Sequence, residues 1–569
     1  MFGIDWRGVH VDTHRMFTRP TLALLLALAL PAVADDPAAR GAQIFQQRCQ
    51  VCHQAEGNGV PGVFPPLAKS DWLSGKREQA IRVLCEGLTG RIQVNGVSFD
   101  GAMPAQAIDD NDVAEVLNFV GRSWGNAVTP FTADEIKAAR AKSKFPKFED
   151  LAKASEYQPL PNPPEGYTVR EVVRLPEGEF GSRLAGDGKS TIVYMLTQGG
   201  NVWRVDWKAD TIEKVIAASD YLDLSRGGVN VLGLTLSPEG ALWITSNQEI
   251  KRDKEYPLNE ASIFRTPPIG PDGKVGKPER WFLHTYPHGG GFNHGISNIA
   301  FGPDGMIYVA SGARTDGGEK PPNHPLSPAG EVETTACLWR LNPKAEQPAI
   351  EVYCRGLRNA YGFTWDGAGR LFTVSNGPDA NAPEEMDLIE QGKHYGFPYQ
   401  FSDWPVQPGK PYPHTPPPPP GVEFVLPVLN DGPAGGRGLS TFDPHSSPAG
   451  TIWCGDDFPP PLRGTFLVPR YGNLLGEGRT GLKSDAGFDV LSVRLEPTKT
   501  APADGSAPRM HAHVETVLAP LGRPLDVLHT GPGRALILEY TRPINFRDGL
   551  GWLSGRIIEL RAQDKVPGK

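Results

Sequence analysis

The stretch Cys49-Gln50-Val51-Cys52-His53 places two thiols three positions apart, with an imidazole directly after the second. In this order the thiols can form thioether bonds to the vinyl groups of a haem, and the histidine is held on one face as an axial iron ligand. The alternative is a zinc knuckle, which needs a second pair of ligands at similar spacing, and none follows. The motif therefore predicts haem c bound covalently by Cys49 and Cys52, with His53 on the iron.

The residues after the motif support this prediction. Residues 57–68, GNGVPGVFPPLA, are too rich in Gly and Pro for a regular element. Met103, in Gly101-Ala102-Met103-Pro104, is the candidate second axial ligand; the alternative is a methionine that fills the core. A thioether opposite an imidazole raises the haem potential, which suits an electron carrier. A helix should follow, capped by Asp110 or Asn111, with an apolar face made of Val113, Val116, Leu117, Val120 and Trp124.

Residues 36–126 resemble the bacterial class I cytochrome c domains over their whole length. The segments GVPGVFPPLA, GAMPA and SWGN are most similar to those of cytochromes attached to quinoprotein dehydrogenases. The resemblance implies a small all-α domain that carries electrons.

The N-terminus has the pattern of a secretory signal. Arg15 and Arg19 precede an apolar run from Leu22 to Leu30, and Ala32-Val33-Ala34 offers a cleavage site. The run is too short to span a bilayer comfortably, and no later segment is long and apolar enough. We therefore expect residues 1–34 to be removed, no transmembrane segment to remain, and the protein to lie in the periplasm, where bacteria attach haem through thioethers.

Composition sets further bounds. The 569 residues are too many for one ordinary domain, and the net charge of −8 argues against a nucleic-acid partner. The 66 glycines and 56 prolines indicate many tight turns. Of the cysteines outside the haem motif, Cys337 and Cys354 flank a predicted pair of strands, so they form either a disulfide or two buried thiols.

Residues 127–165 are expected to be a linker. Thr132 and Glu135 have the spacing of a capping box that opens a charged helix. The segment from Tyr157 to Pro164 then continues as an extended chain stiffened by proline.

From residue 166 to residue 561 one sequence pattern recurs: a turn with Pro, Gly or both, a run of β-forming residues, and a second strand. The turns lie at 185–188, 237–240, 302–305, 366–369, 447–450 and 531–533, before TIVYMLT, ALWITSN, MIYVASG, RLFTVSN, TIWCG and RALILEY. Self-similar units of about 50 residues made of short strands are typical of β-propellers. The sequence therefore predicts a small all-α cytochrome c domain followed by an all-β six-bladed propeller.

Several segments of this region resemble, in order, the soluble quinoprotein sugar dehydrogenases: the glucose, aldose sugar and sorbosone dehydrogenases that use pyrroloquinoline quinone (PQQ). The segments are SGARTD at 311–316, RNAYGF at 358–363, SNGPD at 375–379, EEMDLI at 384–389 and HYGFP at 394–398. The resemblance extends over roughly residues 166–561. It implies that PQQ, bound to Ca²⁺, lies over the propeller axis and accepts hydride from a sugar-like substrate.

The resemblance also implies two catalytic residues. His294 is the expected general base, and an imidazole suits this role because its ordinary pKa lies near neutrality. Arg358, with Asn359 beside it, is expected to contact the polar edge of PQQ, since a guanidinium offers a planar fork of donors to quinone or carboxylate oxygens.

Further residues are implied as cofactor or metal contacts. Arg523 is expected to hold a PQQ carboxylate, and Arg470 falls near a lysine of the family with the same task. Gly377 and Pro378 are expected to present backbone carbonyls to the PQQ-bound Ca²⁺, a hard ion that prefers oxygen ligands. A second, structural calcium site is expected at Glu385 and Tyr395.

The chain departs from the glucose-type pattern at three places. The stretch Gly227–Gly233 lacks the glutamine that those enzymes carry before Leu-Leu-Gly. Ala313 stands where they have an acidic residue, although Asp316 is near, and Leu525 replaces a second arginine. These departures argue against glucose as the specific substrate.

Together the two halves predict a periplasmic quinohaemoprotein that oxidises a sugar or a related hydroxyl or aldehyde. Electrons would pass from PQQ to haem c and then to a periplasmic cytochrome or a terminal oxidase. Fusion replaces a diffusional encounter by a high effective concentration. The alternative is a cytochrome c electron carrier whose propeller is a non-catalytic binding or docking module. The eight-bladed propellers of periplasmic nitrite reductases are poor matches to the segments above.

Overall fold

The structure is a computed structural model. It describes residues 37–59, 64–75, 77–103, 106, 108–142, 157–176, 179–252, 255–289, 293–318, 330–378, 381–402, 404–405, 417–434, 440–473, 486–496, 509–541 and 554–563. The expected signal region, residues 1–34, lies outside these ranges. Within them, no helix is both long enough and apolar enough to cross a membrane.

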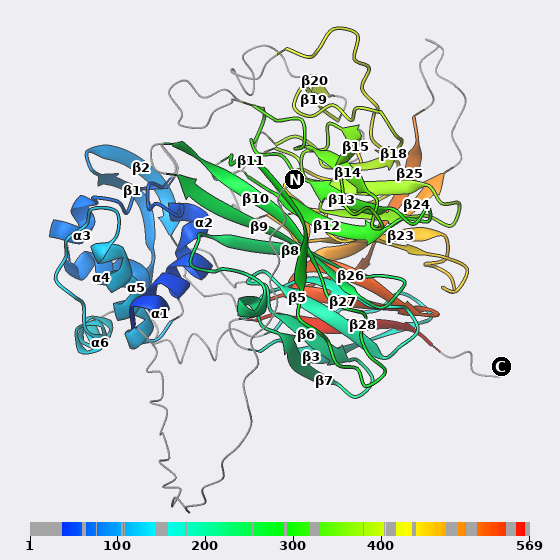
Figure 1. The fold of residues 1–569 in the computed structure, drawn as a ribbon. Coiled ribbons are helices and arrows are strands. Elements are labelled where there is room, and N and C mark those ends of the chain that lie inside the picture. Colours follow the sequence, from blue (N-terminus) through cyan, green and yellow to red (C-terminus); the bar gives the residue numbers. More distant parts are fainter. Residues whose placement is uncertain are drawn as a thin grey trace, which may run out of the picture.

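The N-terminal domain, blue to cyan in Figure 1, is mainly helical. It also contains a β-hairpin, which the expectation of an all-α domain did not include. Its elements are α1 (Pro37–Ile44), a π-helical turn (Phe45–Cys49), α2 (Gln50–His53), α3 (Asp71–Gly75), α4 (Arg77–Glu86), the hairpin β1 (Leu88–Val94) and β2 (Val97–Met103), α5 (Asp110–Arg122) and α6 (Ala133–Lys142).

The core of this domain forms where α1 crosses α5. A Cβ atom at Gly41 would lie 2.2 Å from the carbonyl oxygen of Glu115, so only glycine permits this approach. Phe45 packs against Phe119 and Trp124, with ring centroids 5.4 and 5.0 Å away. The π-helical turn and the end of α5 are thus joined by one aromatic cluster, which brings the haem motif onto α5.

Helix α5 has the predicted apolar face but a different cap. Val113, Val116, Leu117 and Val120 are buried. The cap is Asp109, not Asp110 or Asn111: its backbone is extended, and its carboxylate accepts a hydrogen bond from the backbone N–H of Asp112 at 2.8 Å. The expectation was wrong by one residue because an N-cap must stand outside the helical backbone conformation.

The capping box predicted before α6 is half formed. The hydroxyl of Thr132 accepts a hydrogen bond from the backbone N–H of Glu135 at 3.3 Å. The carboxylate of Glu135 instead pairs with Arg77 on α4, with Nε and Oε1 2.6 Å apart. This ion pair fastens the start of the linker region to the cytochrome domain.

The rest of the chain forms a propeller of six sheets, here called blades 1 to 6 (Figure 1). Each is antiparallel from its innermost strand outward, and blade 4 has three strands where most have four. Blade 1 holds β4 (Gly181–Ala185), β5 (Ile192–Thr197), β6 (Val202–Asp206) and β7 (Thr211–Ile216), and blade 2 holds β8 (Val229–Leu236), β9 (Leu242–Arg252), β10 (Glu255–Arg265) and β11 (Glu279–Pro287). Blade 3 holds β12 (Ile296–Phe301), β13 (Ile307–Ser311), β14 (Cys337–Leu341) and β15 (Glu351–Arg355), and blade 4 holds β16 (Gly362–Trp365), β17 (Leu371–Ser375) and β18 (Glu385–Ile389).

In blades 5 and 6, one pairing joins strands that are not neighbours in the chain. Blade 5 consists of β22 (Ile452–Cys454), β23 (Thr465–Arg470), β24 (Asp489–Glu496) and β25 (His511–Leu518), with β21 (Leu429–Asn430) parallel to β25. Blade 6 consists of β26 (Arg523–Gly531), β27 (Arg534–Tyr540), β28 (Arg556–Ala562) and β3 (Tyr167–Arg174). A separate two-strand sheet pairs β19 (Gln400–Phe401) with β20 (Trp404–Pro405).

Five of the six repeated turns precede the second strand of a blade, at β5, β9, β13, β17 and β27. The fifth turn in the chain does not: residues 447–450 lead into β22, the innermost strand of blade 5. The number of blades was therefore predicted correctly, but the register of this unit was wrong. A short run of β-formers after Pro and Gly has no local feature that tells a first strand from a second.

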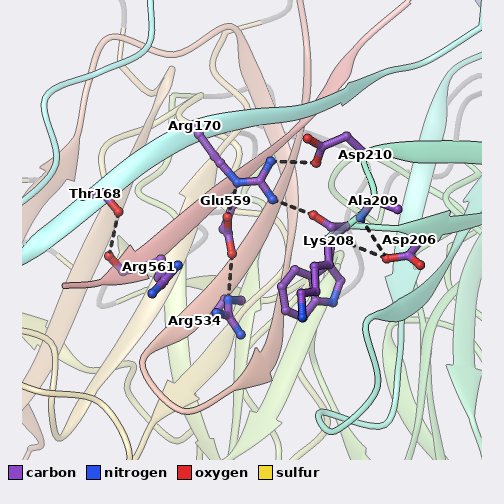
Figure 2. Close-up of polar contacts among 10 residues, drawn as sticks. Thr168, Arg170, Asp206, Lys208, Ala209, Asp210, Arg534, Glu559 and Arg561 are labelled. Atoms are coloured by element: carbon purple, nitrogen blue, oxygen red, sulfur yellow. Dashed lines mark hydrogen bonds and ion pairs between the residues drawn. The ribbon is translucent and has the colours of Figure 1, made fainter. Parts of the chain in front are cut away.

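The ring is closed by β3, which pairs with β28 almost four hundred residues later in the chain. Figure 2 shows the polar contacts beside this closure. Arg170 of β3 and Arg534 of β27 both bind the buried carboxylate of Glu559 on β28, the second through Nε and Oε1 at 2.7 Å. Arg170 also donates to the carboxylate of Asp210 in blade 1 at 2.7 Å. One acid thus links the first and last strands of the propeller.

Glu559→Gln is expected to lower the free energy of unfolding of the propeller by about 2 kcal/mol. The change keeps the shape but removes the charge that two guanidinium groups share, and hydrogen bonds to charged groups contribute roughly 1.5–3 kcal/mol each. Urea unfolding followed by tryptophan fluorescence measures the effect. Glu213→Gln is the matched control: this acid pairs with Arg204 but is 62% exposed, so the loss should stay below about 1 kcal/mol. Equal effects at both positions would contradict the role given to the closure.

Cys337 and Cys354 do not form a disulfide. They lie on neighbouring strands, but Cys337 pairs with Arg355 and Cys354 pairs with Leu338, so the two thiols point to opposite faces of blade 3. Cys337 packs among residues of blades 2 and 3, and Cys354 among residues of blades 3 and 4. Of the two interpretations, two buried thiols is the correct one.

Candidate functional site

The first candidate site is an apolar cavity in the N-terminal domain. Cys49, Cys52, His53 and Met103 all line it, together with aliphatic and aromatic side chains from α3, α4, the hairpin and α5. The sequence motif and the methionine 50 positions after His53 are therefore brought to one pocket. A cavity lined by apolar side chains, with two cysteines at its edge, suits a flat apolar macrocycle bound through those cysteines.

The ring of His53 is oriented by the Gly- and Pro-rich loop. Its Nδ1 lies 3.0 Å from the carbonyl oxygen of Pro65, so Nδ1 carries the proton and Nε2 the lone pair. Burial lowers the pKa of His53, which keeps the imidazole neutral, and the bond to Pro65 opposes this only in part. A neutral ring fixed through its second nitrogen is the usual arrangement of an axial histidine.

The thiols fit thioether formation better than zinc binding. Burial raises the pKa of Cys49 to about 12, against the lowering effect of Arg48. Zinc binds the thiolate, which this environment disfavours. Among the described residues, no cluster of three His, Cys, Asp or Glu side chains is arranged to hold a metal ion by itself. The residues present therefore fit haem c and not a zinc knuckle.

Met103→Ala is expected to lower the reduction potential of the haem on the order of 0.1 V, a fraction of the roughly 0.8 V over which axial ligands tune haems. Met103 ends β2 and lines the haem pocket, so its sulfur is the candidate ligand opposite His53. Spectroelectrochemical titration measures the potential. Leu84→Ala, at another lining residue, is the control for a simple loss of packing. A potential that falls no further in Met103→Ala than in Leu84→Ala would show that Met103 is only a core residue.

The second candidate site lies on one face of the propeller, where the first strand of each blade begins and the second ends. His294 lies two residues before the first strand of blade 3, and Arg358 and Asn359 lie shortly before that of blade 4. Arg523 begins the first strand of blade 6. Gly377 and Pro378 follow the second strand of blade 4, and Arg470 ends the second strand of blade 5. Topology therefore brings all the predicted cofactor and catalytic residues of the propeller to this face, here called the site face.

His294 and Asn359 approach each other across Gly312. A Cβ atom at Gly312 would lie 2.5 Å from the Cβ of His294 and 3.3 Å from the side-chain oxygen of Asn359. The Nδ1 of His294 lies 2.9 Å from the carbonyl oxygen of Ala313, which places the proton on Nδ1 and the lone pair on Nε2. In this tautomer Nε2 is the nitrogen that can accept a proton, as a general base does.

Arg358 is buried in an ion pair with Asp316. Its Nη2 lies 2.6 Å from Oδ1 of Asp316, and its Nε donates to the backbone carbonyl of the same residue at 3.0 Å. Asp316, which follows the position where the family carries its acid, is thus the acidic partner at this site. Asn359 is held by its side-chain amide, which donates to Asn376 at 3.0 Å.

The other two arginines also have protein partners. Arg470 makes a two-pronged ion pair with Asp489, at 2.8 and 2.7 Å, and lies 3.2 Å from Asp443. Arg523 is buried between the rings of Tyr471 and Phe488 and donates to the carbonyl of Asn473 at 3.1 Å. Arg470 therefore has the contacts of a structural ion pair. The contacts of Arg523 described above are with two aromatic rings and a backbone carbonyl.

Sequence reasoning missed Glu384 as part of this site. Burial raises the pKa of Glu384 to about 8, against the hydrogen bonds from Ser446 and Ser447 and the charges of Arg470 and Arg358. Its carboxylate accepts from the hydroxyl of Ser446 at 2.8 Å and the N–H of Ser447 at 2.6 Å. One buried acid thus lies between the cations of blades 4 and 5. Glu384 belongs to the EEMDLI segment, but nothing in the sequence shows that Glu384, and not Glu385, is the buried glutamate.

His445 is a second residue that gained significance only from the structure. Its Nε2 lies 2.6 Å from the side-chain oxygen of Asn381. Burial lowers the pKa of His445, while Asp316 and Arg358, both close enough to act on it, have opposite effects. A second imidazole therefore belongs to the Arg358 cluster.

The propeller axis is closed by a buried ion pair. Arg183 of β4 lies 3.0 Å from the carboxylate of Asp526 on β26 and donates to the carbonyls of Tyr361 at 2.9 Å and Leu232 at 3.3 Å. Residues of four blades are joined at this point. No sequence signal could pair Arg183 with a residue 343 positions away.

The residues expected at a second calcium site bind protein groups. The carboxylate of Glu385 accepts from the backbone N–H of Ser402 at 2.5 Å. The hydroxyl of Tyr395 donates to the carbonyl of Leu388 at 2.7 Å. This site stays a prediction.

Comparison with known proteins identifies both parts. Residues 38–124 match the family model described as Cytochrome c, and residues 272–416 match that described as Glucose / Sorbosone dehydrogenase. Cytochrome c-552 of Thermus thermophilus is 42% identical over 137 residues, which cover 22% of this chain and 90% of that protein. The cytochrome c subunit of the quinone alcohol dehydrogenase of Gluconobacter oxydans is 28% identical over 115 residues, which cover 18% of this chain and 22% of that protein. The PQQ-bound aldose sugar dehydrogenase of Streptomyces coelicolor is 20% identical, covers 70% of this chain and 99% of its own, and has a TM-score of 0.43.

The fold and the haem pocket define a multidomain protein in which a haem c domain precedes a six-bladed propeller. The chain belongs to the cytochrome c family through its N-terminal domain. The propeller that follows contains the stretch, residues 272–416, that matches the glucose/sorbosone dehydrogenase model. The fold class and both family resemblances predicted from the sequence are thereby confirmed.

Proposed function

We propose that this protein is a periplasmic PQQ-dependent dehydrogenase that oxidises a sugar or a related hydroxyl or aldehyde and passes the electrons to its own haem c. The observation that carries the proposal is the convergence of His294, Arg358 and Asn359 on the site face, with His294 in the tautomer of a base. The family of the propeller and the haem c domain support a redox reaction.

The donor set of the site face fits PQQ, which carries three carboxylates and a quinone. Arg523 would hold a carboxylate, Arg358 and Asn359 would contact the quinone edge, and Arg470 would add positive charge behind them. When bound with Ca²⁺, PQQ supplies an acceptor for two electrons. The backbone carbonyls of Gly377 and Pro378 would hold the ion, in keeping with its preference for oxygen ligands.

His294 would remove the proton of the substrate hydroxyl. The bond from Nδ1 to Ala313 keeps Nε2 basic and stabilises the ring after it takes the proton, because the same bond strengthens when the ring is charged. Arg358 would stabilise the negative charge that develops at the quinone oxygen.

One observation favours the alternative of a non-catalytic propeller. Arg358 and Arg470 are already paired with carboxylates of the protein, Asp316 for the first and Asp489 and Asp443 for the second. In that case the propeller would be a docking module and the cytochrome a carrier between respiratory partners, such as a periplasmic cytochrome and a terminal oxidase.

The test uses the purified full chain with its haem. PQQ and Ca²⁺ are added, binding is checked by mass spectrometry, and a panel of aldoses, alcohols and aldehydes is supplied. We expect at least one substrate to reduce both a soluble dye and the haem, and EDTA to abolish both signals until Ca²⁺ is restored. If PQQ does not bind, or if it binds and no substrate reduces either acceptor, the docking module is the correct interpretation.

A further inference from the structure

The two domains touch at a glycine. A Cβ atom at Gly228 would lie 2.2 Å from Nε2 and 3.2 Å from Cδ of Gln50. Gln50 is the first residue of α2 and lies inside the haem-binding motif, next to Cys49. Figure 1 draws α2 beside blade 2, in agreement with this contact. The part of the cytochrome that meets the propeller here is therefore the turn to which the haem is tethered.

The propeller backbone is shaped for this approach. Gly227, directly before Gly228, has a φ of +150°. A Cβ atom on Gly227 would lie 2.0 Å from the carbonyl oxygen of Glu249. The N–H of Glu249 donates to the carbonyl of Gly228 at 3.0 Å, so the glycine pair is fastened to the second strand of its blade. Two glycines in a row thus present bare backbone to the incoming turn.

This contact lies on the site face. Gly228 directly precedes β8, the innermost strand of blade 2, and His294 lies two residues before β12, the innermost strand of blade 3. Asn247 links the two strands: it donates to the carbonyls of Asn230 at 3.3 Å and Ile296 at 2.8 Å, and it accepts from the N–H of Ile296 at 2.7 Å. Gly228 and His294 are each two residues from a partner of Asn247, so the haem turn docks next to the proposed base.

We propose that the bare backbone at Gly228 is the docking seat of the haem-binding turn and sets the intramolecular transfer of electrons from the site face to the haem. The inference rests on the proposed function. Each substrate oxidation releases two electrons and two protons. The haem takes the electrons one at a time, Fe(III) being reduced to Fe(II) and reoxidised between transfers by an external one-electron acceptor such as ferricyanide. The protons leave to solvent.

The variants place a bulky side chain in the contact, on the propeller side or on the haem side. In Gly228→Phe the ring occupies the space of the Gln50 amide, and in Gln50→Phe the haem turn itself carries the bulk, which keeps the test open if one variant does not fold. Gly199→Phe is the matched control, because Gly199 has no heavy atom within 4 Å of its would-be Cβ and lies in a turn of blade 1. Gly228→Ala should be mild, because only the flexible tip of Gln50 must move.

Three readouts separate docking from catalysis. Haem reduction by substrate in a stopped-flow instrument should slow about tenfold or more in either Phe variant. Linking two modules raises their effective concentration, which can improve their association by about 10²–10⁴. A haem turn that no longer docks keeps the linker but loses part of this advantage. Reduction of a soluble dye by the same protein should stay within about twofold, because Gly228 is neither the base nor a cofactor contact. X-ray scattering without PQQ or substrate should show a larger radius of gyration than in Gly199→Phe.

The outcomes are distinct. Unchanged haem reduction together with an unchanged radius of gyration in both Phe variants would overturn the docking seat. Equal loss of dye and haem reduction would also overturn it, because the effect would then lie in the chemistry of the site. If the wild-type chain reduces no dye with any substrate, the proposed function fails by itself, and the scattering comparison still decides whether the haem turn sits on Gly228.

Discussion

His294→Ala is expected to lower kcat/KM for sugar oxidation by about 10²–10⁴, the range over which a positioned general base contributes. The ring is held by its Nδ1 contact with the carbonyl of Ala313 and by the close approach that Gly312 allows, so its Nε2 is the basic atom on the site face. Dye-linked steady-state kinetics of the full chain, with PQQ and Ca²⁺ bound, measures the loss.

The control for this prediction is His513→Ala. His513 lies in β25 of blade 5, is 42% exposed at its side chain, and has its Nε2 2.9 Å from the carboxylate of Glu515. It should change kcat/KM by less than about twofold, as for most surface substitutions. PQQ binding by His294→Ala should also be retained. A variant that binds PQQ and keeps its activity would exclude His294 as the base and turn attention to His445, the other imidazole of the cluster.

The second large effect is expected in the double variant Cys49→Ala/Cys52→Ala, which should contain no covalent haem. Both thioether bonds are lost, and the apolar pocket that the macrocycle would fill is left without its tether. Haem staining after denaturing electrophoresis measures attachment. The electrons of the sugar would then reach a soluble dye but no haem, so dye-linked activity should persist while haem reduction disappears.

Cys85→Ala serves as the control for this double variant. Cys85 is a buried thiol of the same domain and lies on α4, outside the motif. Its removal should leave haem attachment complete, since a thioether requires the spacing of Cys49 and Cys52 before His53. Haem that remains covalently bound in the double variant, or is lost in Cys85→Ala, would contradict the assignment of the motif.

The cytochrome half was predictable because its chemistry is local. Cys49, Cys52 and His53 lie within five consecutive residues. The helical spacing of apolar residues in α5 predicts the buried face that packs in the same core. The exceptions are also local in origin. The hairpin β1–β2 was missed although its sequence carries a local signal, because apolar and polar residues alternate on both sides of the turn Asn95-Gly96. The cap of α5 moved to Asp109 among three consecutive candidates.

The propeller was predictable as a repeat and not as a ring. Each blade is built mostly from consecutive strands joined by turns, and Gly and Pro mark those turns in the sequence. The strand that closes the ring, β3, comes from the other end of the chain, and its partners Glu559 and Arg534 carry no mark of the pairing. The opposite orientations of Cys337 and Cys354 follow from a one-residue difference in register, which spacing along the chain does not reveal.

By itself, the order of amino acids determined that this protein carries haem c and that its larger part is a six-bladed propeller, because both rest on signals within short windows: a covalent attachment motif and a recurring strand pattern. Only the tertiary structure decided which charged groups share the site face, that Glu384 and His445 belong with Arg358, and that Gln50 of the haem turn rests on Gly228. The physical reason is that burial and charge pairing act through space, between residues whose separation along the chain has no bearing on their distance.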